Sequence, residues 1–411
     1  MELNAYFFVI LLTVVAIYKM DLLADLLNLR SLGAPLPPEF ADVFGAEDYA
    51  KSQEYTRAKT ILGVIEASAS LGLFLVFWFA AGFPWLDQWG RGLAQGEVGR
   101  GLLLVSVLAL GSSLFSLPFE IYRTFSLEER FGFNRTTPQV FVMDHLKSLG
   151  ISAALGLPLF ALIIWLFARW ELAWLYSFLA VTGGNLFFRY VGPKWLLPIF
   201  HKFSPMEEGE LKSAIDGLSV RCGFPLVGIY VIDGSKRSSK TNAFFTGFGK
   251  NKRIALFDTL IENHSIPELV AVLAHEIGHF KKKHVIQNLA TGIAESALIF
   301  FLLGFFLRNE ELFAAFGVRE TSIYLGLIFF GILYTPISKL SSILRSIWSR
   351  KNEFEADAYA AEVTGSPANL IAALKKVTRD NLGNVTPHPF HVFLNYSHPP
   401  VLRRIEALRN L

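Results

Sequence analysis

The 411-residue sequence predicts a mainly α-helical, polytopic membrane protein that also carries a small α+β part. Hydrophobic residues make up 52% of the chain and charged residues only 18%, which is far from the balance of soluble proteins. Apolar runs long enough to cross about 30 Å of hydrocarbon recur along the chain. One polar stretch between the fifth and sixth runs instead combines helix-like and strand-like patterns.

Seven apolar runs are candidate transmembrane helices. The first is short unless it continues through MDLLADLLNL, and the fifth contains Gly183, Gly184 and Asn185. The N-terminus lacks a basic stretch and a cleavage site of small residues, so we predict a retained first helix rather than a cleaved signal peptide. The runs cover residues 6–18, 61–82, 101–118, 149–168, 172–190, 286–307 and 321–344.

The runs divide the chain into four segments. Residues 1–192 hold the first five predicted spans, 193–284 form the polar insertion, 285–345 hold the last two spans, and 346–411 form a C-terminal helical segment. Within the insertion, SPMEEGELKSAIDGLSVRCG has a helical pattern, whereas VGIYVIDG, NAFFTGFG and RIALFD are typical of strands. In the last segment, WSRKNEFEADAYAAEVTG predicts a helix that stops at Gly365.

The distribution of basic residues predicts the orientation in the membrane. Seven spans place the two termini on opposite sides. With the N-terminus outside, the outward loops hold only a few basic residues, and most others, including the lysines at 281–283, fall inside. We therefore expect the insertion on the cytoplasmic side of a bacterial inner membrane or of the endoplasmic reticulum. The outward residues are Arg91, Arg100, Arg169, Arg308 and Arg319.

Charge and cysteine content exclude several kinds of partner and site. The net charge is +3 without a long block of lysine and arginine, so we expect no nucleic-acid partner. Cys222 is the only cysteine, which excludes an intramolecular disulfide and a zinc site built from several thiolates.

The last helix of the insertion contains AHEIGHF, whose spacing is typical of a zinc-binding helix. Ser265 and Glu268 predict a capping box at its start. His275 and His279 are four residues apart, so both imidazoles lie on one helix face and can hold one tetrahedral ion. Zinc lowers the pKa of its bound water to about 7. Glu276 is the expected general base, which accepts the proton of this water and passes it to the leaving amine.

A second helix offers the third ligand. In RKNEFEADAYA, Glu353 and Asp357 again lie four apart on one face. Glu353 suits the third position around one Zn²⁺, and Asp357 can accept the outer ring N–H of a zinc-bound histidine. Glu355 lies on another face and is expected to be a solvated charge. His284, five residues after His279, is rotated off the ligand face and is not predicted as a ligand.

Taken alone, the histidine motif could also be a polar helix face with two solvated histidines and no metal. Its pairing with the carboxylates of the second helix favours the zinc site over this alternative.

These motifs resemble those of the type I CaaX prenyl proteases, integral-membrane zinc endopeptidases of the gluzincin group. The resemblance is carried by SKRSSKTNAFFTGFGKNKRIALFDTLI, ELVAVLAHEIGHF, SRKNEFEADAYA and SHPPVLRRIEAL, and in the N-terminal half by LPPEF and YRTFSLEERFGFNRTTPQVFVMDHLK. The resemblance implies the same roles that the spacing predicts. The zinc ligands are His275, His279 and Glu353, the general base is Glu276, and Asp357 supports a ligand.

The resemblance also implies four further site residues. Asn242 and Ala243 lie on an extended segment whose backbone is expected to pair with the substrate peptide. His398 and Arg404 are expected near the active site. His398 would donate to the oxyanion of the reaction, and Arg404 would bind substrate or brace the site.

The architecture implied by the resemblance is a ring of seven helices around a large hydrated chamber. The chamber would bring water to the metal, and gaps between helices would admit a lipidated peptide. Glu66, Asn185 and Glu295, which lie within predicted spans, would then face the chamber. The expected partners are a lipidated or extended peptide and membrane lipid, and the protein is expected to work as a monomer.

Three functions follow from these observations. The leading hypothesis is a zinc endopeptidase that removes the C-terminal three residues after a prenylated cysteine. A membrane quality-control protease with broad substrates is the alternative among enzymes, because a chamber that accepts extended segments suits both. A non-catalytic membrane scaffold or transporter is the alternative from another class, although every residue needed for hydrolysis is present.

Overall fold

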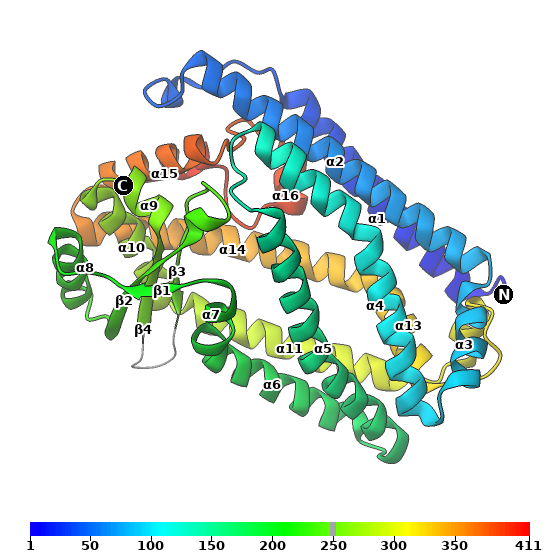
Figure 1. Ribbon diagram of the computed structural model, residues 1–411. Coiled ribbons are helices and arrows are strands. Elements are labelled where there is room, and N and C mark those ends of the chain that lie inside the picture. The colour runs from blue at the N-terminus through cyan, green and yellow to red at the C-terminus, as the bar shows by residue number, and fades with distance from the viewer. Residues whose placement is uncertain (247–251) are drawn as a thin grey trace.

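Long helices form most of the molecule, and a small sheet lies at one end of them (Figure 1). The computed structural model describes residues 1–246 and 252–411. This arrangement confirms the predicted fold class, a mainly helical membrane protein with a small α+β part. The membrane part contains α1 (Ala5–Ser31), α2 (Ala46–Phe79), α3 (Gly82–Leu93), α4 (Gly96–Tyr122), α5 (Pro138–Arg169), α6 (Ala173–Trp195), α11 (His284–Phe306), α12 (Glu310–Ala315), α13 (Ile323–Leu333) and α14 (Thr335–Thr364).

Five helices of the described residues are long and apolar enough to cross a membrane. They are α1, α2, α5, α11, and α4 together with the π-helix η2 (Arg123–Glu128) that extends it. These helices contain all or most of the first four apolar runs and of the sixth. α1 continues through MDLLADLLNL to Ser31, so the first run gains the length that a span requires.

The bent pair α13 and α14 supplies a sixth span if the two helices are counted together. Their axes differ by 49°, and Pro336 lies in the first turn of α14. A proline has no backbone N–H to donate and clashes with the preceding turn, which accounts for a break at this point. Beyond the bend, α14 runs without interruption across the predicted segment boundary at 345 and ends, as predicted, at Gly365, whose φ is 74°.

The predicted count of seven spans is not confirmed. Five or six spans are found among the described residues, and α6, which contains most of the fifth run, is not one of them. Asn185 and Arg189 lie within α6 and lower its mean hydropathy.

The polar insertion folds around a four-stranded sheet with the order β1-β2-β4-β3. β2 and β4 pair in parallel, and β1 and β3 run antiparallel to their neighbours at the two edges. Three strands match the predicted runs, whereas the short β1 was not predicted. The bounds are β1 (Phe203–Pro205), β2 (Leu226–Ile232), β3 (Ala243–Thr246) and β4 (Lys252–Phe257).

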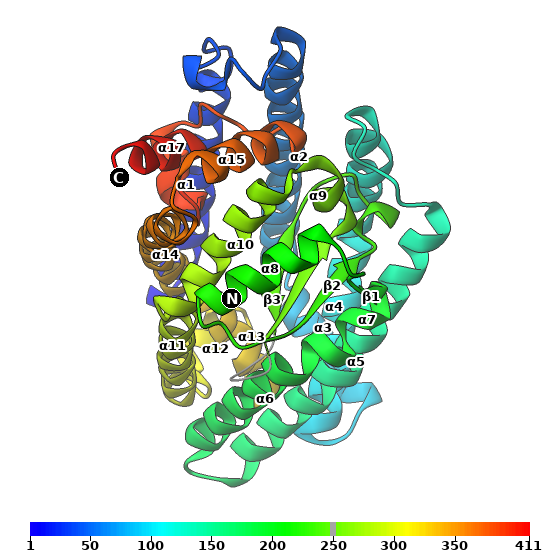
Figure 2. The ribbon, with the colours of Figure 1, turned by 90° about the vertical axis from the view of Figure 1, so that its left-hand side faces the viewer.

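One face of the sheet packs on the helix that carries the histidine motif. Ile254 and Leu256 of β4 share a fully buried core with Leu273 and Ile277 of α10. In Figure 2, β3 is the strand on the α10 side of the sheet, and β1 lies on the side of α5 and α7. The remaining elements of the insertion are α7 (Leu197–Phe200), α8 (Glu210–Arg221), η3 (Gly234–Lys236), α9 (Asp258–Asn263) and α10 (Ile266–Lys281).

The C-terminal helices dock on the N-terminal part of the chain. Asn28 of α1 accepts a hydrogen bond from the backbone N–H of His388, and the buried Lys375 forms an ion pair with Glu39 at 2.7 Å. This docking holds the C-terminal segment that leads to His398 and α17 against the N-terminal part of the chain. The elements involved are η1 (Pro38–Phe40), α15 (Ala368–Asp380), α16 (Pro389–Asn395) and α17 (Val401–Arg409).

Candidate metal centre

The two helices predicted to carry the metal ligands, α10 and α14, pack closely because small residues meet where they touch. Gly278 lies within the histidine motif, and a Cβ at this position would come within 3.1 Å of the Cα and the carbonyl oxygen of Ala356. Any larger side chain would push the helices apart. The predicted capping box of Ser265 and Glu268 is present at the start of α10. The glycine between the two histidines therefore brings them within reach of α14.

His275, His279 and Glu353 converge from these helices, as the sequence predicts. The Nε2 atoms of the two histidines are 3.2 Å apart. The carboxylate oxygens of Glu353 lie 3.5 Å from Nε2 of His275 and 3.3 Å from Nε2 of His279. A tetrahedral ion with ligand bonds of about 2.0–2.1 Å keeps its ligand atoms about 3.3 Å from one another. The two contacts of Glu353 are made by different oxygens, Oε2 and Oε1, and one ligand atom from each of the three residues lies within 4.8 Å of the other two. This spacing suits a single metal ion.

The chemistry of the three donors also favours a cation. The side chain of Glu353 is only 3% exposed. Its buried Oε2 atom lies 2.9 Å from Nδ1 of His398 and 3.3 Å from Nη1 of Arg404. A buried carboxylate that faces two imidazole nitrogens is costly unless positive charge lies between them. One divalent ion would satisfy all three groups at once.

His275 is held on its outer side by two buried charged residues. Its Nδ1 lies 2.8 Å from Asp357, as the sequence predicts. Arg404 donates to both oxygens of the same carboxylate at 2.8 and 2.6 Å. Burial lowers the pKa of Arg404, but Asp357 raises it further, so the guanidinium stays charged. This arrangement fixes the ring orientation that directs Nε2 toward the ligand group.

His279 has a different outer partner, which the sequence reasoning missed. Its Nδ1 lies 3.0 Å from Nδ1 of His284, and Nε2 of His284 lies 3.2 Å from Glu355. His284 is 2% exposed, whereas Glu355 remains 42% exposed despite this contact. The group of three residues that could hold a metal ion, within the described part of the chain, consists of His275, His279 and Glu353.

The backbone explains why spacing alone did not reveal this contact. α10 ends at Lys281, and Lys283 adopts a left-handed conformation with φ of 60° before α11 begins at His284. The angular offset expected for one continuous helix therefore does not apply to His284. In the sequence, only the three lysines at 281–283 indicated that the helix could end before His284.

His398 and Glu276 complete the surroundings of the ligand group. Nδ1 of His398 lies 2.9 Å from Oε2 of Glu353, and its side chain remains 65% exposed. The Glu353 carboxylate holds the pKa of His398 above its ordinary value. Glu276 is half-buried on α10, and its charge also raises the pKa values of His398 and Arg404. The structure thus brings the distant His398 and Arg404 to the motif.

Asn242 and Ala243 lie at the free edge of the sheet. Ala243 begins β3 and pairs with Leu256 of β4, and the carbonyl of Asn242 accepts from the backbone N–H of Phe257 at 3.2 Å. Asn242 is exposed. The last part of the NAFFTGFG run, residues 247–249, falls outside the described residues.

The partly exposed Lys240 anchors the segment that leads into β3. Nζ of Lys240 donates to Glu128 and to the hydroxyl of Tyr55, both at 2.7 Å, and lies 4.5 Å from the centre of the Phe133 ring. Glu128 belongs to the π-helix η2, so a membrane helix is tied directly to the edge strand. The sequence reasoning missed these residues because they are far apart along the chain.

Two of the polar residues predicted within spans are paired with arginines. Glu66 forms an ion pair with Arg123 at 2.5 Å, and Glu295 forms one with Arg345. Asn185 lines a cavity between α6 and α11 together with Arg189. Pairing lowers the cost of placing such charges among apolar helices.

Family models match the chain in two consecutive parts. Residues 25–202 match the model described as CAAX prenyl protease N-terminal, five membrane helices. Residues 205–411 match the model described as peptidase family M48. The junction at 202–205 lies at the start of β1.

Individual relatives are similar over almost the whole chain. CAAX prenyl protease 1 of Saccharomyces cerevisiae is 35% identical and covers 91% of this chain and 88% of its own. The CAAX prenyl protease 1 homolog of Homo sapiens is 32% identical, with 92% and 89% coverage. The crystal structure of S. mikatae Ste24p superposes with a TM-score of 0.92 at 33% identity, covering 99% of this chain and 100% of that one.

The two family models divide the chain between most of the membrane helices and the segment that holds the candidate metal centre. The M48 model spans all three converging side chains, and the N-terminal model covers most of the long apolar helices. The chain belongs to peptidase family M48, alongside the CAAX prenyl proteases, and is a membrane-embedded metallopeptidase.

Proposed function

We propose that this enzyme uses one Zn²⁺ to hydrolyse the peptide bond after a prenylated cysteine, releasing the C-terminal tripeptide of a CaaX sequence. The observation that carries the proposal is the convergence of His275, His279 and Glu353 at the spacing of one tetrahedral ion. The substrate class is supported by the names of the relatives, which are CAAX prenyl proteases.

Each polar residue around the ligands has a separate task in this proposal. The bound zinc would supply a water molecule whose pKa is lowered to about 7. Glu276 accepts a proton from the attacking water and delivers it to the leaving amine. His398 donates a hydrogen bond to the oxyanion that develops on the scissile carbonyl. Asp357 and Arg404 hold His275 in place.

The edge strand offers a way to bind an extended peptide without a strict sequence requirement. Asn242 and Ala243 begin the outer strand of the sheet, and strand addition uses backbone hydrogen bonds. The lipid would lie in an apolar part of a hydrated chamber between the membrane helices. The protein would act as a monomer, with its N-terminus outside and the metal centre on the cytoplasmic side, as the basic residues favour.

Peptide cleavage by the purified protein tests the proposal. Farnesylated and unmodified peptides with the same CaaX sequence are incubated with the zinc-loaded enzyme, and the products are identified by mass spectrometry. We expect a single cut after the cysteine, a clear preference for the farnesylated peptide, and loss of cleavage with a chelator. Equal turnover of both peptides, or cuts at many positions, would contradict the prenyl-specific activity and favour a broad quality-control protease.

Glu276→Gln separates the chemistry from metal binding. We expect cleavage to fall by about 10²–10⁴-fold while zinc content stays stoichiometric. Glu262→Gln, an exposed glutamate of α9, is the matched control and should retain full activity. Normal cleavage by Glu276→Gln would exclude this residue as the general base.

A further inference from the structure

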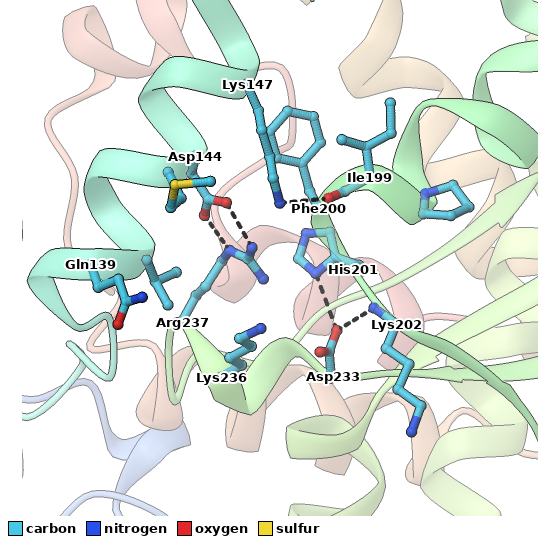
Figure 3. Close-up of a pocket in the computed structure, with 13 residues that line it drawn as sticks. Gln139, Asp144, Lys147, Ile199, Phe200, His201, Lys202, Asp233, Lys236 and Arg237 are labelled. Carbon is cyan, nitrogen blue, oxygen red and sulfur yellow. Dashed lines mark hydrogen bonds and ion pairs between the residues drawn. The ribbon is translucent and has the colours of Figure 1, made fainter.

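A second polar cavity lies where α5 meets the insertion, away from the metal centre (Figure 3). Its volume is about 560 Å³. It is lined by the first turns of α5, by α7 with the two residues that follow it, and by the turn at η3. These segments adjoin β1, whereas the proposed substrate strand β3 is the opposite edge of the sheet. None of the proposed catalytic or metal-binding residues lines this cavity.

Positive charge predominates in the lining. Lys147, Lys202, Lys236 and Arg237 are opposed by only two carboxylates, those of Asp144 and Asp233. Burial lowers the pKa of the neighbouring His201, so this ring adds no charge at neutral pH. The cavity is therefore a cationic site.

Both carboxylates already have partners. Arg237 donates to the two oxygens of Asp144 at 2.7 and 3.0 Å, and Asp233 accepts from the backbone N–H of Lys202 at 2.8 Å. The ammonium groups of Lys202 and Lys236 have no carboxylate partner in the part of the chain that the structure describes. Two exposed cations therefore remain available to an anionic ligand.

Arg237 provides a more buried donor. Figure 3 shows its guanidinium between the Asp144 carboxylate and the His201 ring. Its Nη1 is buried and has no hydrogen-bond partner among the described residues. A buried guanidinium N–H without an acceptor is costly, and a phosphate oxygen is a well-matched acceptor for it.

Exposed aromatic residues near the cavity are of the kind expected at a membrane–water interface. α6 ends just before α7, and its last turns expose Tyr190 and Trp195, each 61% accessible. Such aromatic residues are typical of the headgroup level. The rim of the cavity includes Met143 and Ile199, which are 47% and 40% exposed. Cations beside exposed apolar side chains match a phospholipid, which carries its phosphate next to its acyl chains.

We propose that this cavity binds the phosphate headgroup of an anionic phospholipid. Basic pockets beside membrane helices are the usual sites for such headgroups. The phosphate accepts from Arg237 Nη1 and from the lysines at 202 and 236, and the acyl chains leave over the apolar rim. Because Lys202 follows α7 whereas Lys236 and Arg237 lie at the turn at η3, the lipid would bridge two segments of the insertion beside α5.

Titration of the full-length protein in detergent with short-chain lipids tests this site. Dioctanoyl phosphatidic acid is compared with dioctanoyl phosphatidylcholine and with inorganic phosphate, and binding is read by native mass spectrometry and by the shift in Tm. We expect tight binding of phosphatidic acid only. Equal binding of inorganic phosphate would show a free-anion site, and equal binding of phosphatidylcholine would show binding without charge recognition. Either result would overturn the proposal.

Charge removal locates the binding within the molecule. The double variant Lys202→Gln/Lys236→Gln should weaken phosphatidic acid binding about 30-fold, since each lysine near an anionic headgroup contributes severalfold. Lys51→Gln/Arg221→Gln removes the same charge from exposed positions elsewhere and should bind as the parent does. Both lysines of the cavity are exposed, so the variant should fold. Unchanged affinity in the cavity variant would place the lipid elsewhere and contradict the assignment.

Discussion

The two histidines of the motif use the same ring nitrogen toward the ligand group but are supported by different surroundings. His275 is backed by the buried ion pair of Asp357 and Arg404, whose side chains are 2% and 9% exposed. His279 is backed by the imidazole of His284 and then by the partly exposed Glu355. One side of the site is thus an enclosed charged network, and the other is a relay that ends near solvent.

This difference separates two kinds of contribution to a metal site. A buried ion pair is costly to break because the remaining charge is left without a partner. A relay through a neutral imidazole mainly fixes the tautomer and orientation of the ligand. We therefore expect changes on the His275 side to affect both stability and metal affinity, and changes on the His279 side to affect mainly metal affinity.

The largest effect is expected where the two sides meet, at Glu353. Glu353→Gln removes the charged ligand that both histidines face, so zinc content should fall to a small fraction and peptide cleavage by at least about 10³-fold. Metal analysis and a cleavage assay measure these losses. Glu362→Gln, an exposed glutamate of the same helix, is the control. Full zinc content in Glu353→Gln would exclude this residue as a ligand.

The next largest effect is expected on the His275 side. Asp357→Asn leaves the buried guanidinium of Arg404 without its bidentate partner, so the free energy of unfolding should fall by about 3 kcal/mol. Zinc affinity should fall about 10–100-fold. Thermal unfolding followed by tryptophan fluorescence and chelator competition measure the two quantities.

A double variant separates two roles of Asp357. One is to neutralise the buried charge of Arg404, and the other is to orient the ring of His275. Asp357→Asn/Arg404→Met removes both charges and should recover part of the lost stability without recovering zinc affinity. Recovery of both would show that Asp357 acts on the fold alone and would remove its role in orienting His275.

A smaller effect is expected on the His279 side. His284→Leu removes the contact to His279 and should lower zinc affinity about 10-fold, with less loss of stability than Asp357→Asn causes. His284→Asn keeps a polar atom near the position of Nδ1 and should restore part of the affinity. A larger loss of stability in His284→Leu than in Asp357→Asn would overturn the contrast between the two sides.

The smallest effect is expected at the start of α10, outside both networks. Burial raises the pKa of Glu268, but Lys376 and the backbone N–H of Ser265 lower it further, to below the usual value of 4.5. A carboxylate with a lowered pKa in the folded state stabilises the protein above the unfolded pKa and loses this effect as the pH falls through the folded value.

Glu268→Gln tests this pH dependence. At pH 7 it should lower the free energy of unfolding by about 1 kcal/mol, and the difference from the parent should shrink as the pH falls below 4.5. Thermal unfolding between pH 7 and pH 4 measures it, and zinc affinity at pH 7 should stay unchanged. A difference that grows on acidification would contradict the assigned direction of the pKa shift.

Patterns that depend on neighbouring residues were predicted well. The capping box of α10, the stop at Gly365 and three of the four strands are present because helix and strand periodicity act over a few residues. The predicted count of seven spans was not confirmed. Asn185 and Arg189 lower the mean hydropathy of α6, and Pro336 divides the last apolar run. β1 was missed because three residues are too few for a pattern.

The sequence by itself determined that His275 and His279 share one helix face and that Glu353 and Asp357 share another, because a spacing of four residues places side chains on one face wherever the helix lies. Only the tertiary structure decided that these two faces meet and what surrounds them. Arg404 reaches Asp357 across 47 positions, and His284 meets His279 after a left-handed turn at Lys283. The cationic cavity beside α5 likewise forms from three separate segments. Contacts of this kind depend on how helices cross and on where the backbone reverses direction. Neither can be predicted from a pattern of neighbouring residues.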